Sequence, residues 1–445
     1  MTTSQVVSTE LKKYKSSENA FLPKIVTILL SQEKGNVCNP LVKVGDLVNE
    51  GDVIAVSETD TSVAKIHSPI PGKVVDIVMT LGPNGCYEKS IRIRFSGSFS
   101  YTGKKLLEKR WHACSEKTLI DRIIEKGICN TFVTNKPVSL GGEILKLNEK
   151  ADRNLVVRLF DDDKLRIADS LLSKFFYEKI VKGAEITAKA VSAKNIIFVV
   201  DSKSDLLKEQ SNEVNKDSND TEKSINQKNI SVIKTSIVKY PSGNKRQIIL
   251  SVNKKKNANV KIAKDDLFVD SYAMLDVYNG IVLDMPVISR YVHFSGNCIP
   301  ASCFLQVKIG YTIRDLIEQV GGFVNQPSMV LINGQICGNA INRLDIPVTK
   351  YVKSIEFISK AKKTDTHIYS CIDCGNCRSI CKVGISPDLL YKYTTNKMEI
   401  TEKQIESSKM CSDCGLCNTV CPSRLPLCQT IAVLNNRIAG VENEK

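Results

Sequence analysis

The chain has 445 residues, of which 42% are hydrophobic and 25% charged, and 62 Lys and Arg residues against 48 Asp and Glu give a formal net charge of +14. This composition excludes a collagen-like or wholly disordered chain, and apolar runs far shorter than the about 20 residues of a spanning helix exclude a transmembrane segment. At about 100–200 residues per domain, the length predicts two to four domains. Residues 1–19 lack the apolar core of a secretory signal and are interpreted as an N-terminal extension.

Residues 20–100 predict a small all-β domain, because Gly-Asp turns punctuate short runs of alternating apolar residues. The pattern resembles the hammerhead β-barrel of biotinyl and lipoyl carrier domains. In those carriers a hairpin tip presents the modified lysine, and the matching stretch here is Glu58-Thr59-Asp60-Thr61-Ser62. Thr61 stands in the place of the lysine, so we do not expect a swinging arm.

Residues 101–200 change to a helical period and predict a Rossmann-like α/β domain. Ser115 caps an expected helix that ends at Gly127, and strands are expected at 154–160 and 195–200, with helical stretches between them. The usual Gly-rich turn after the first strand is missing. The pair Gly141-Gly142 is either a turn that starts a helix or a phosphate cradle.

Three further segments follow. Residues 201–232 are rich in Ser, Asn, Lys, Asp and Glu and predict a disordered insertion. Residues 233–303 continue the α/β domain, with strand, turn and strand expected over 237–251. Residues 304–361 predict a compact β-grasp (SLBB-like) module with a helix from Thr312 to Val320, which we interpret as a structural spacer.

Eight of the sixteen cysteines form two groups near the C-terminus, CIDCGNCRSICKVG and CSDCGLCNTVCPSR. Both have the spacing C-x2-C-x2-C-x3-C, which is that of a bacterial [4Fe–4S] ferredoxin, where the fourth cysteine ligates the other cluster. Residues 362–436 therefore predict an α-helical double-cluster ferredoxin domain, followed by a tail at 437–445. The expected ligands are Cys371, Cys374, Cys377 and Cys421 for one cluster and Cys411, Cys414, Cys417 and Cys381 for the other.

Structural zinc fits this spacing poorly, because zinc sites favour C-x2-C pairs separated by a longer loop. A zinc-bound scaffold without redox function stays open as an alternative. The remaining cysteines have no ligand spacing and are expected to be ordinary buried thiols. They are Cys38, Cys86, Cys114, Cys129, Cys298, Cys303, Cys337 and Cys428.

The order of these parts resembles the RnfC subunit of Rnf-type ion-translocating oxidoreductases. That family is similar to the NADH-binding flavoprotein subunit of respiratory complex I and to the cobalamin reductase of propanediol utilisation. The resemblance runs from about Leu22 to Asn436, and besides the cluster motifs it rests on KYPSG at Lys239 to Gly243 and on the run YNGIVLDMPVISRYVHFSGN. It implies a peripheral protein on the cytoplasmic face of the inner (plasma) membrane that relays single electrons and binds the other membrane subunits of such a complex.

The basic charge fits an acidic ferredoxin or flavodoxin as a docking partner. We expect no nucleic-acid partner, because no nucleic-acid module is present and the chain has one Trp. Lys382 follows the fourth cysteine of the first group, where Pro422 stands in the second. A positive charge beside a cluster is expected to raise its reduction potential.

In the family, two loops form the flavin and NADH site, G-L-G-G-A-G-F-P and N-G-A-E-C-E-P. Here the first reads Gly127 to Val133 and has no Gly cluster, and the second reads Arg158 to Lys164 and keeps acidic residues only at Asp161 and Asp163. The resemblance thus implies the fold with a vestigial FMN and NADH site at Asp161 and Asp163. An NAD(H)-dependent FMN/iron–sulfur oxidoreductase with a modified pocket is the alternative function.

Overall fold

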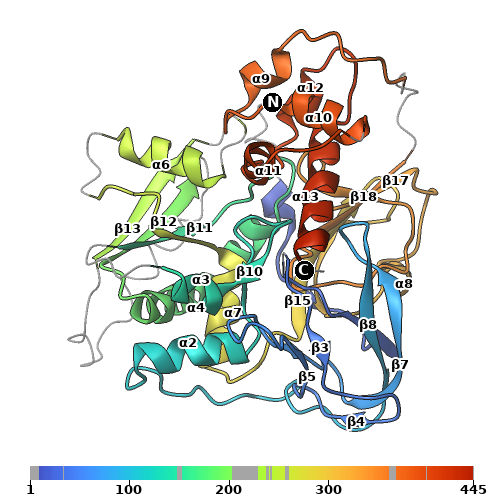
Figure 1. The fold of residues 1–445 in the computed structure, drawn as a ribbon. Helices are drawn as coiled ribbons and strands as arrows, with labels where there is room; N and C mark the ends of the chain where they lie inside the picture. Colours follow the sequence, from blue (N-terminus) through green and yellow to red (C-terminus); the bar gives the residue numbers. More distant parts are fainter. Residues whose placement is uncertain are drawn as a thin grey trace. The chain divides into compact units, whose positions relative to one another are not determined.

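The computed structural model describes residues 10–33, 35–147, 153–202, 229–236, 240, 243–255, 260–359, 367–396 and 398–443. The chain divides into two compact units, Met1–Ser359 and Lys360–Lys445, and is a mixed α/β protein with several sheets (Figure 1). Among the described residues, no helix has the length and apolar character needed to cross a membrane.

The N-terminal part of the first unit consists of two small sheets around an apolar core that includes Val26, Ile54 and Ile93. Gly72 begins a long strand where a Cβ atom would lie 2.2 Å from the Arg94 carbonyl oxygen, so this close strand pairing requires glycine. One sheet has the order β2 (Ile25–Leu29), β8 (Tyr87–Phe95), β7 (Gly72–Leu81), β4 (Leu47–Val48), and the other β3 (Asn39–Pro40), β5 (Val53–Val56), β6 (Ile66–His67).

The stretch Glu58–Ser62 forms the turn between β5 and β6, and it packs against the rest of the unit. A Cβ atom on Gly142 would lie 2.7 Å from the Ser62 carbonyl oxygen, and the Lys65 amide donates to the Ile124 carbonyl at 3.2 Å. The turn is therefore held in place by its neighbours.

A four-stranded parallel sheet lies at the centre of the first unit. Its order is β13 (Asn229–Thr235), β12 (Asn195–Asp201), β11 (Asn154–Arg158), β14 (Leu267–Asp270). Apolar residues point alternately to both faces, as expected for a sheet covered on both sides. Leu155 and Phe198 pack under α4 and α7, and Val156 and Ile197 pack under α6, which lies on the opposite face in Figure 1.

The helices around this sheet begin where side chains cap their free amides. Ser115 accepts a hydrogen bond from the Thr118 amide at 3.2 Å, which confirms the predicted cap of the first helix. The helices are α2 (Glu116–Glu125), α3 (Leu140–Leu145), α4 (Ala168–Ala190), α6 (Lys245–Asn253) and α7 (Ser271–Ile281).

Helix α6 corrects the strand, turn and strand expected over 237–251. Asn244 caps its N-terminus by accepting from the Gln247 amide at 2.9 Å, and Ile248 and Val252, four residues apart, pack onto the sheet. The boundary of the expected insertion also moves, because β13 begins at Asn229; residues 203–228 lie outside the described residues.

The last part of the first unit is a six-stranded sheet with its own core, which includes Phe294, Ile332 and Phe357. Thr312 caps its helix α8 (Ile313–Gln319), as the sequence predicts. The strand order is β1 (Glu18–Asn19), β16 (Cys303–Lys308), β15 (Ser289–Gly296), β19 (Ser354–Ile358), β17 (Met329–Ile332), β18 (Asn339–Ile341).

The described residues of the second unit form short helices. Gly375 and Gly415 have φ angles of 75° and 70° and turn the chain into α9 and α12. The helices are α9 (Asn376–Ile380), α10 (Pro387–Thr395), α11 (Glu402–Lys409), α12 (Leu416–Thr419) and α13 (Leu427–Asn443). Helix α13 continues through most of the stretch interpreted as a tail.

Helices α4 and α7 approach so closely that Gly183 cannot carry a side chain: a Cβ atom there would lie 1.9 Å from the Met274 carbonyl oxygen. We expect Gly183→Ala to lower the free energy of unfolding, because overpacking by about 1–3 kcal/mol outweighs the about 1 kcal/mol that alanine gains in helix propensity. Urea unfolding followed by the fluorescence of Trp111, the chain's one tryptophan, measures this. Glu178→Ala on the exposed side of α4 is the control, and an equal effect of both changes would contradict the close packing.

Candidate functional site

The two cysteine motifs fold alike in the second unit. In each motif an aspartate with a positive φ angle, Asp373 at 56° and Asp413 at 52°, precedes the second cysteine. The glycine after that cysteine turns the chain so that the third cysteine, Cys377 or Cys417, lies buried at the start of a short helix. Three thiols of each motif therefore face one local space.

Two pockets of the second unit are each lined by four cysteines of the expected ligand sets. The structure brings together three cysteines of one motif with the fourth of the other, which is the exchange that the spacing predicts. The first pocket contains Cys371, Cys374, Cys377 and Cys421, and the second contains Cys411, Cys414, Cys417 and Cys381.

The donor set of these pockets suits a thiolate-bound iron–sulfur group. Apolar residues such as Leu425 and Leu427 surround the sulfurs, and burial raises the pKa of the Cys377 and Cys414 thiols. A metal must therefore displace protons to hold these sulfurs as thiolates. Cys428 also lines the second pocket, although its position in the sequence predicts no ligand role.

The parallel sheet of the first unit has a second candidate location. Its strand order reverses between β11 and β14, and ligands of open α/β sheets bind beyond the carboxyl ends of the strands at such a point. Asp161 and Asp163 follow β11 at this end of the sheet, and Asp270 ends β14.

Asp161 and Asp163 bind groups of the protein itself. Asp161 accepts the amides of Asp169 at 2.9 Å and Ser170 at 3.1 Å, and so caps α4, whose N-cap residue Ile167 offers no side-chain acceptor. Asp163 accepts the amides of Ile336 at 2.8 Å and Cys337 at 2.9 Å and holds the loop between β17 and β18. Both carboxylates have structural roles here.

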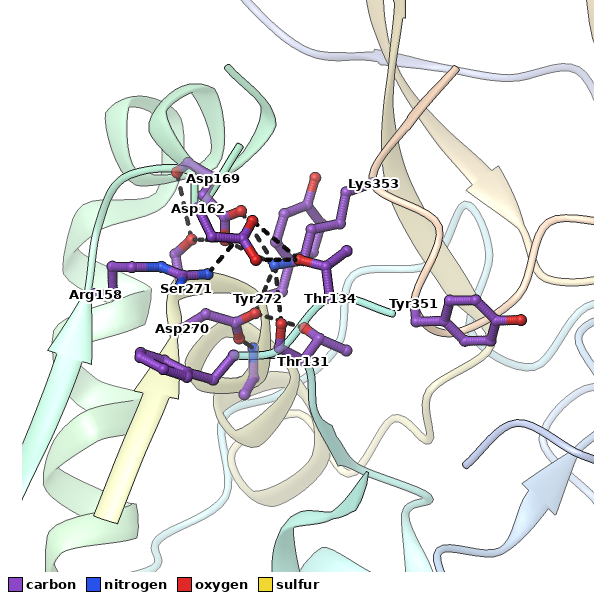
Figure 2. Close-up of polar contacts among 12 residues, drawn as sticks. Thr131, Thr134, Arg158, Asp162, Asp169, Asp270, Ser271, Tyr272, Tyr351 and Lys353 are labelled. Carbon is purple, nitrogen blue, oxygen red and sulfur yellow. Dashed lines mark hydrogen bonds and ion pairs between the residues drawn. The ribbon is translucent and has the colours of Figure 1, made fainter. Parts of the chain in front are cut away.

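A buried ion network occupies the same place, and Figure 2 shows its centre. The Lys353 ammonium lies 3.0 Å from Asp169 Oδ1 and 2.6 Å from Asp270 Oδ2, and all three side chains are fully buried. Arg166, also fully buried, donates to Asp161 at 2.9 Å and to Asp169 at 3.1 Å. The charged groups at this end of the sheet thus pair with one another.

Burial and pairing act in opposite directions on the two carboxylates. Burial alone raises the pKa of Asp270, but Lys353 and the hydrogen bonds from Thr131 and Ala273 outweigh it and lower this pKa to about 2. The resulting stabilisation is present above the unfolded-state pKa of about 4 and is lost as the pH falls toward 2. For Asp169 burial outweighs the attraction of Lys353 and raises the pKa to about 6, so its ionisation costs stability as the pH rises from about 4 to 6.

The stretch Gly127 to Val133 is also turned inward. Lys353 donates to the Thr131 carbonyl at 3.3 Å, and the Asn130 amide group donates to the Phe268 carbonyl at 2.8 Å. At Gly141, inside α3, a Cβ atom would lie 2.4 Å from Ile124. The glycine pair therefore belongs to a tightly packed helix start, and the phosphate cradle is wrong.

The residues at the strand ends do not fit a flavin or a nicotinamide nucleotide. The backbone amides and carboxylates that would bind its phosphates and ribose already bind Lys353, Arg166 and main-chain groups. A bound nucleotide would have to break buried ion pairs to enter, and unpaired buried charges are costly.

Comparison with known proteins finds two family models that match this chain, the RnfC Barrel sandwich hybrid domain over residues 7–98 and the Nuo51 FMN-binding domain over residues 142–277. The RnfC-type protein of the ion-translocating oxidoreductase complex of Rhodobacter capsulatus is 26% identical over 377 residues, 82% of this chain and 69% of that protein. The chain is RnfC-like.

Other relatives extend the similarity of this RnfC-like chain. The corresponding protein of the proton-translocating ferredoxin:NAD(+) oxidoreductase complex of Clostridium ljungdahlii is 26% identical over 85% of this chain and 81% of its own length. That of the Na(+)-translocating ferredoxin:NAD(+) oxidoreductase complex of Acetobacterium woodii is 24% identical over 84% and 82%.

Among solved structures, a chain of the NAD+-reducing [NiFe]-hydrogenase in the H2-reduced state matches with a TM-score of 0.49 and 10% identity. The match covers 72% of this chain and 61% of that one, which is less than two thirds of its length. The same hydrogenase in the air-oxidized state matches with a TM-score of 0.45.

Lys353 is a functional residue of the fold that sequence reasoning missed. It stands immediately before β19, and the one signal for it is a charge at the edge of a run that otherwise predicts a buried strand. Its partners Asp169 and Asp270 lie 184 and 83 residues away. Such pairing depends on the fold and has no local pattern.

We expect Lys353→Met to destabilise the first unit by about 3–5 kcal/mol, because it leaves Asp169 and Asp270 buried with one cation fewer. Urea unfolding followed by Trp111 fluorescence measures the change. Lys13→Met is the matched control, since Lys13 pairs with Glu10 at the surface, where a pair contributes about 0–1 kcal/mol. A loss below about 1 kcal/mol for Lys353→Met would contradict the role given to the network.

Proposed function

We propose that the chain is the electron-transfer subunit of an Rnf-like, membrane-associated oxidoreductase complex, and that it relays single electrons through two [4Fe–4S] clusters. The observation that carries the proposal is the pair of pockets in the second unit, each lined by four cysteines drawn from both motifs. The similarity to RnfC-type proteins of ion-translocating complexes supports the setting.

When bound, the clusters supply the one-electron chemistry, and the protein supplies ligands and surroundings. Cys371, Cys374, Cys377 and Cys421 hold one, and Cys411, Cys414, Cys417 and Cys381 hold the other. The apolar side chains of Leu425, Leu427 and Ile431 shield the sulfurs from water. Lower exposure and fewer hydrogen bonds to sulfur favour the less negative state of a cluster, so these side chains set its potential.

The architecture that we assign follows the family. Residues 20–100 are a hammerhead domain, 101–200 and 233–303 a Rossmann-like domain, 304–361 an SLBB-like β-grasp module, and 362–436 a double-cluster ferredoxin domain. The match to the RnfC barrel sandwich hybrid domain and the parallel sheet with helices on both faces support the first two assignments.

On this proposal the chain does not oxidise NADH itself, because the ion network around Lys353 fills the end of the sheet where a flavin would bind. Its partners are the other membrane subunits of the complex and an acidic ferredoxin or flavodoxin, which the net charge of +14 attracts. It is a peripheral protein on the cytoplasmic face of the inner membrane.

Cofactor content after anaerobic purification tests the relay against the NADH-oxidising alternative, which the match to the FMN-binding domain favours. We expect about eight iron and eight sulfide per chain, as two [4Fe–4S] clusters require, with no flavin. Dithionite should bleach the visible absorption and NADH should not. One FMN per chain together with bleaching by NADH would establish the dehydrogenase instead, and zinc without sulfide would establish the scaffold.

Single cysteine changes test the ligand sets. Cys374→Ala removes a ligand from the first pocket and Cys414→Ala from the second, so we expect each variant to retain about four iron per chain and to lose one of two electron paramagnetic resonance signals. Cys114→Ala, in the first unit, is the control and should keep both signals. Full iron content in both pocket variants would refute the assignment.

A further inference from the structure

The second unit is a repeat whose two halves differ in what they place beside the sulfurs. Each cysteine of the second motif lies 40 residues after its counterpart, so Asp388 in the first half corresponds to Cys428 in the second. The structure keeps this correspondence, because Asp388 lines the pocket of Cys371, Cys374 and Cys377, and Cys428 lines the other.

The residue after the third cysteine positions this side chain in both halves. In the first half the Arg378 guanidinium donates to both carboxylate oxygens of Asp388, at 2.8 and 3.0 Å from Nε. In the second half Asn418, the counterpart of Arg378, accepts the Cys428 amide at 2.9 Å. Both contacts fix the first turn of the helix that follows, α10 or α13, against the pocket.

The substitution of a carboxylate by a thiol changes the charge at the pocket wall. The Asp388 carboxylate is almost fully buried and lines the first pocket, whereas its partner Arg378 is 46% exposed and does not line it. In the second pocket the same place holds an uncharged thiol. The sulfur of Cys428, the Cys411 sulfur and an Asp413 oxygen all lie within 4.8 Å of one another.

A second pair of counterparts acts in the same direction. Lys382 lines the second pocket, and its counterpart Pro422 lines the first. Asp373 and Asp413 occupy equivalent positions in the two motifs, so they do not distinguish the halves. The second pocket therefore has a cation and a sulfhydryl where the first has a proline and a carboxylate.

We propose that the second pocket holds its cluster at a higher reduction potential than the first, and that Cys428 and Lys382 set the difference. The inference rests on the two clusters of the proposed function. Five sulfurs line a pocket whose cluster takes four ligands, so the fifth, Cys428, donates its hydrogen to a ligand or cluster sulfur. Hydrogen bonds to sulfur and nearby positive charge stabilise the more negative reduced state. One electron that leaves the first cluster thus enters the second.

A redox titration of the anaerobically purified full chain, followed by electron paramagnetic resonance, tests the proposal. We expect two one-electron steps, and the Cys374→Ala variant, which lacks the first cluster, should keep the step at higher potential. Cys428→Ala should lower that step alone, by about tenfold in the reduction equilibrium constant, or about 59 mV. Cys428→Ser keeps a donor and should restore most of the shift, and Lys382→Gln should lower the same step.

The controls separate this proposal from the one that it rests on. Cys114→Ala should move neither step, and iron and sulfide are measured on each sample. If the unchanged chain contains no clusters, both proposals fail. If it contains both clusters, then coincident steps, or a Cys428→Ala variant and a Lys382→Gln variant that leave the upper step in place, would overturn the inequality and leave the relay intact. If Cys428→Ala does not assemble its cluster, the serine variant and Lys382→Gln decide.

Discussion

The Lys353 ammonium is the interaction on which the first unit depends. Lys353 precedes the strand β19 of the six-stranded sheet, and its charge lies between Asp169, at the start of α4, and Asp270, at the end of β14. A single buried cation therefore joins that sheet to both sides of the place where the parallel sheet reverses its order. None of these three charges can leave without stranding another in a medium where an unpaired charge is very costly. The network is strong because its members are inseparable.

The second unit depends on another constraint, the exchange of the fourth cysteine. Each pocket takes sulfurs from both motifs, so neither half can complete its ligand set alone. Its helices are short, and its apolar core consists largely of residues that also line the pockets. A unit of this size has little apolar surface to bury, and metal binding contributes to the folding of such domains. Ligand binding and folding are thus one event in the proposed protein.

The sequence predicted features whose cause is local. Ser115 and the apolar residues after it specify a capped helix, and the spacing of the cysteines specifies which sulfurs share a pocket, because both depend on geometry within a few residues. Helix α6 was missed because Ile248 and Val252 lie in a run whose alternation also fits a strand. The acidic character of Asp161 and Asp163 was visible, but only the fold decides that they cap amides. Lys353 had no pattern at all, since its partners are distant in the sequence.

The parallel sheet keeps a purpose when its nucleotide site is filled, because it is the frame that holds the other parts of the first unit. Buried Lys350 donates at 2.8 Å both to the Lys65 carbonyl of the N-terminal sheets and to the Gly127 carbonyl after α2. The turn at Ser62 packs against Gly142, and Asp163 holds the loop of the six-stranded sheet. Every one of these contacts uses a residue of the former nucleotide region or its immediate surroundings. On the proposed function, the groups that bind a nucleotide in the family have become the ones that fix a scaffold, and electron transfer is left to the cysteines.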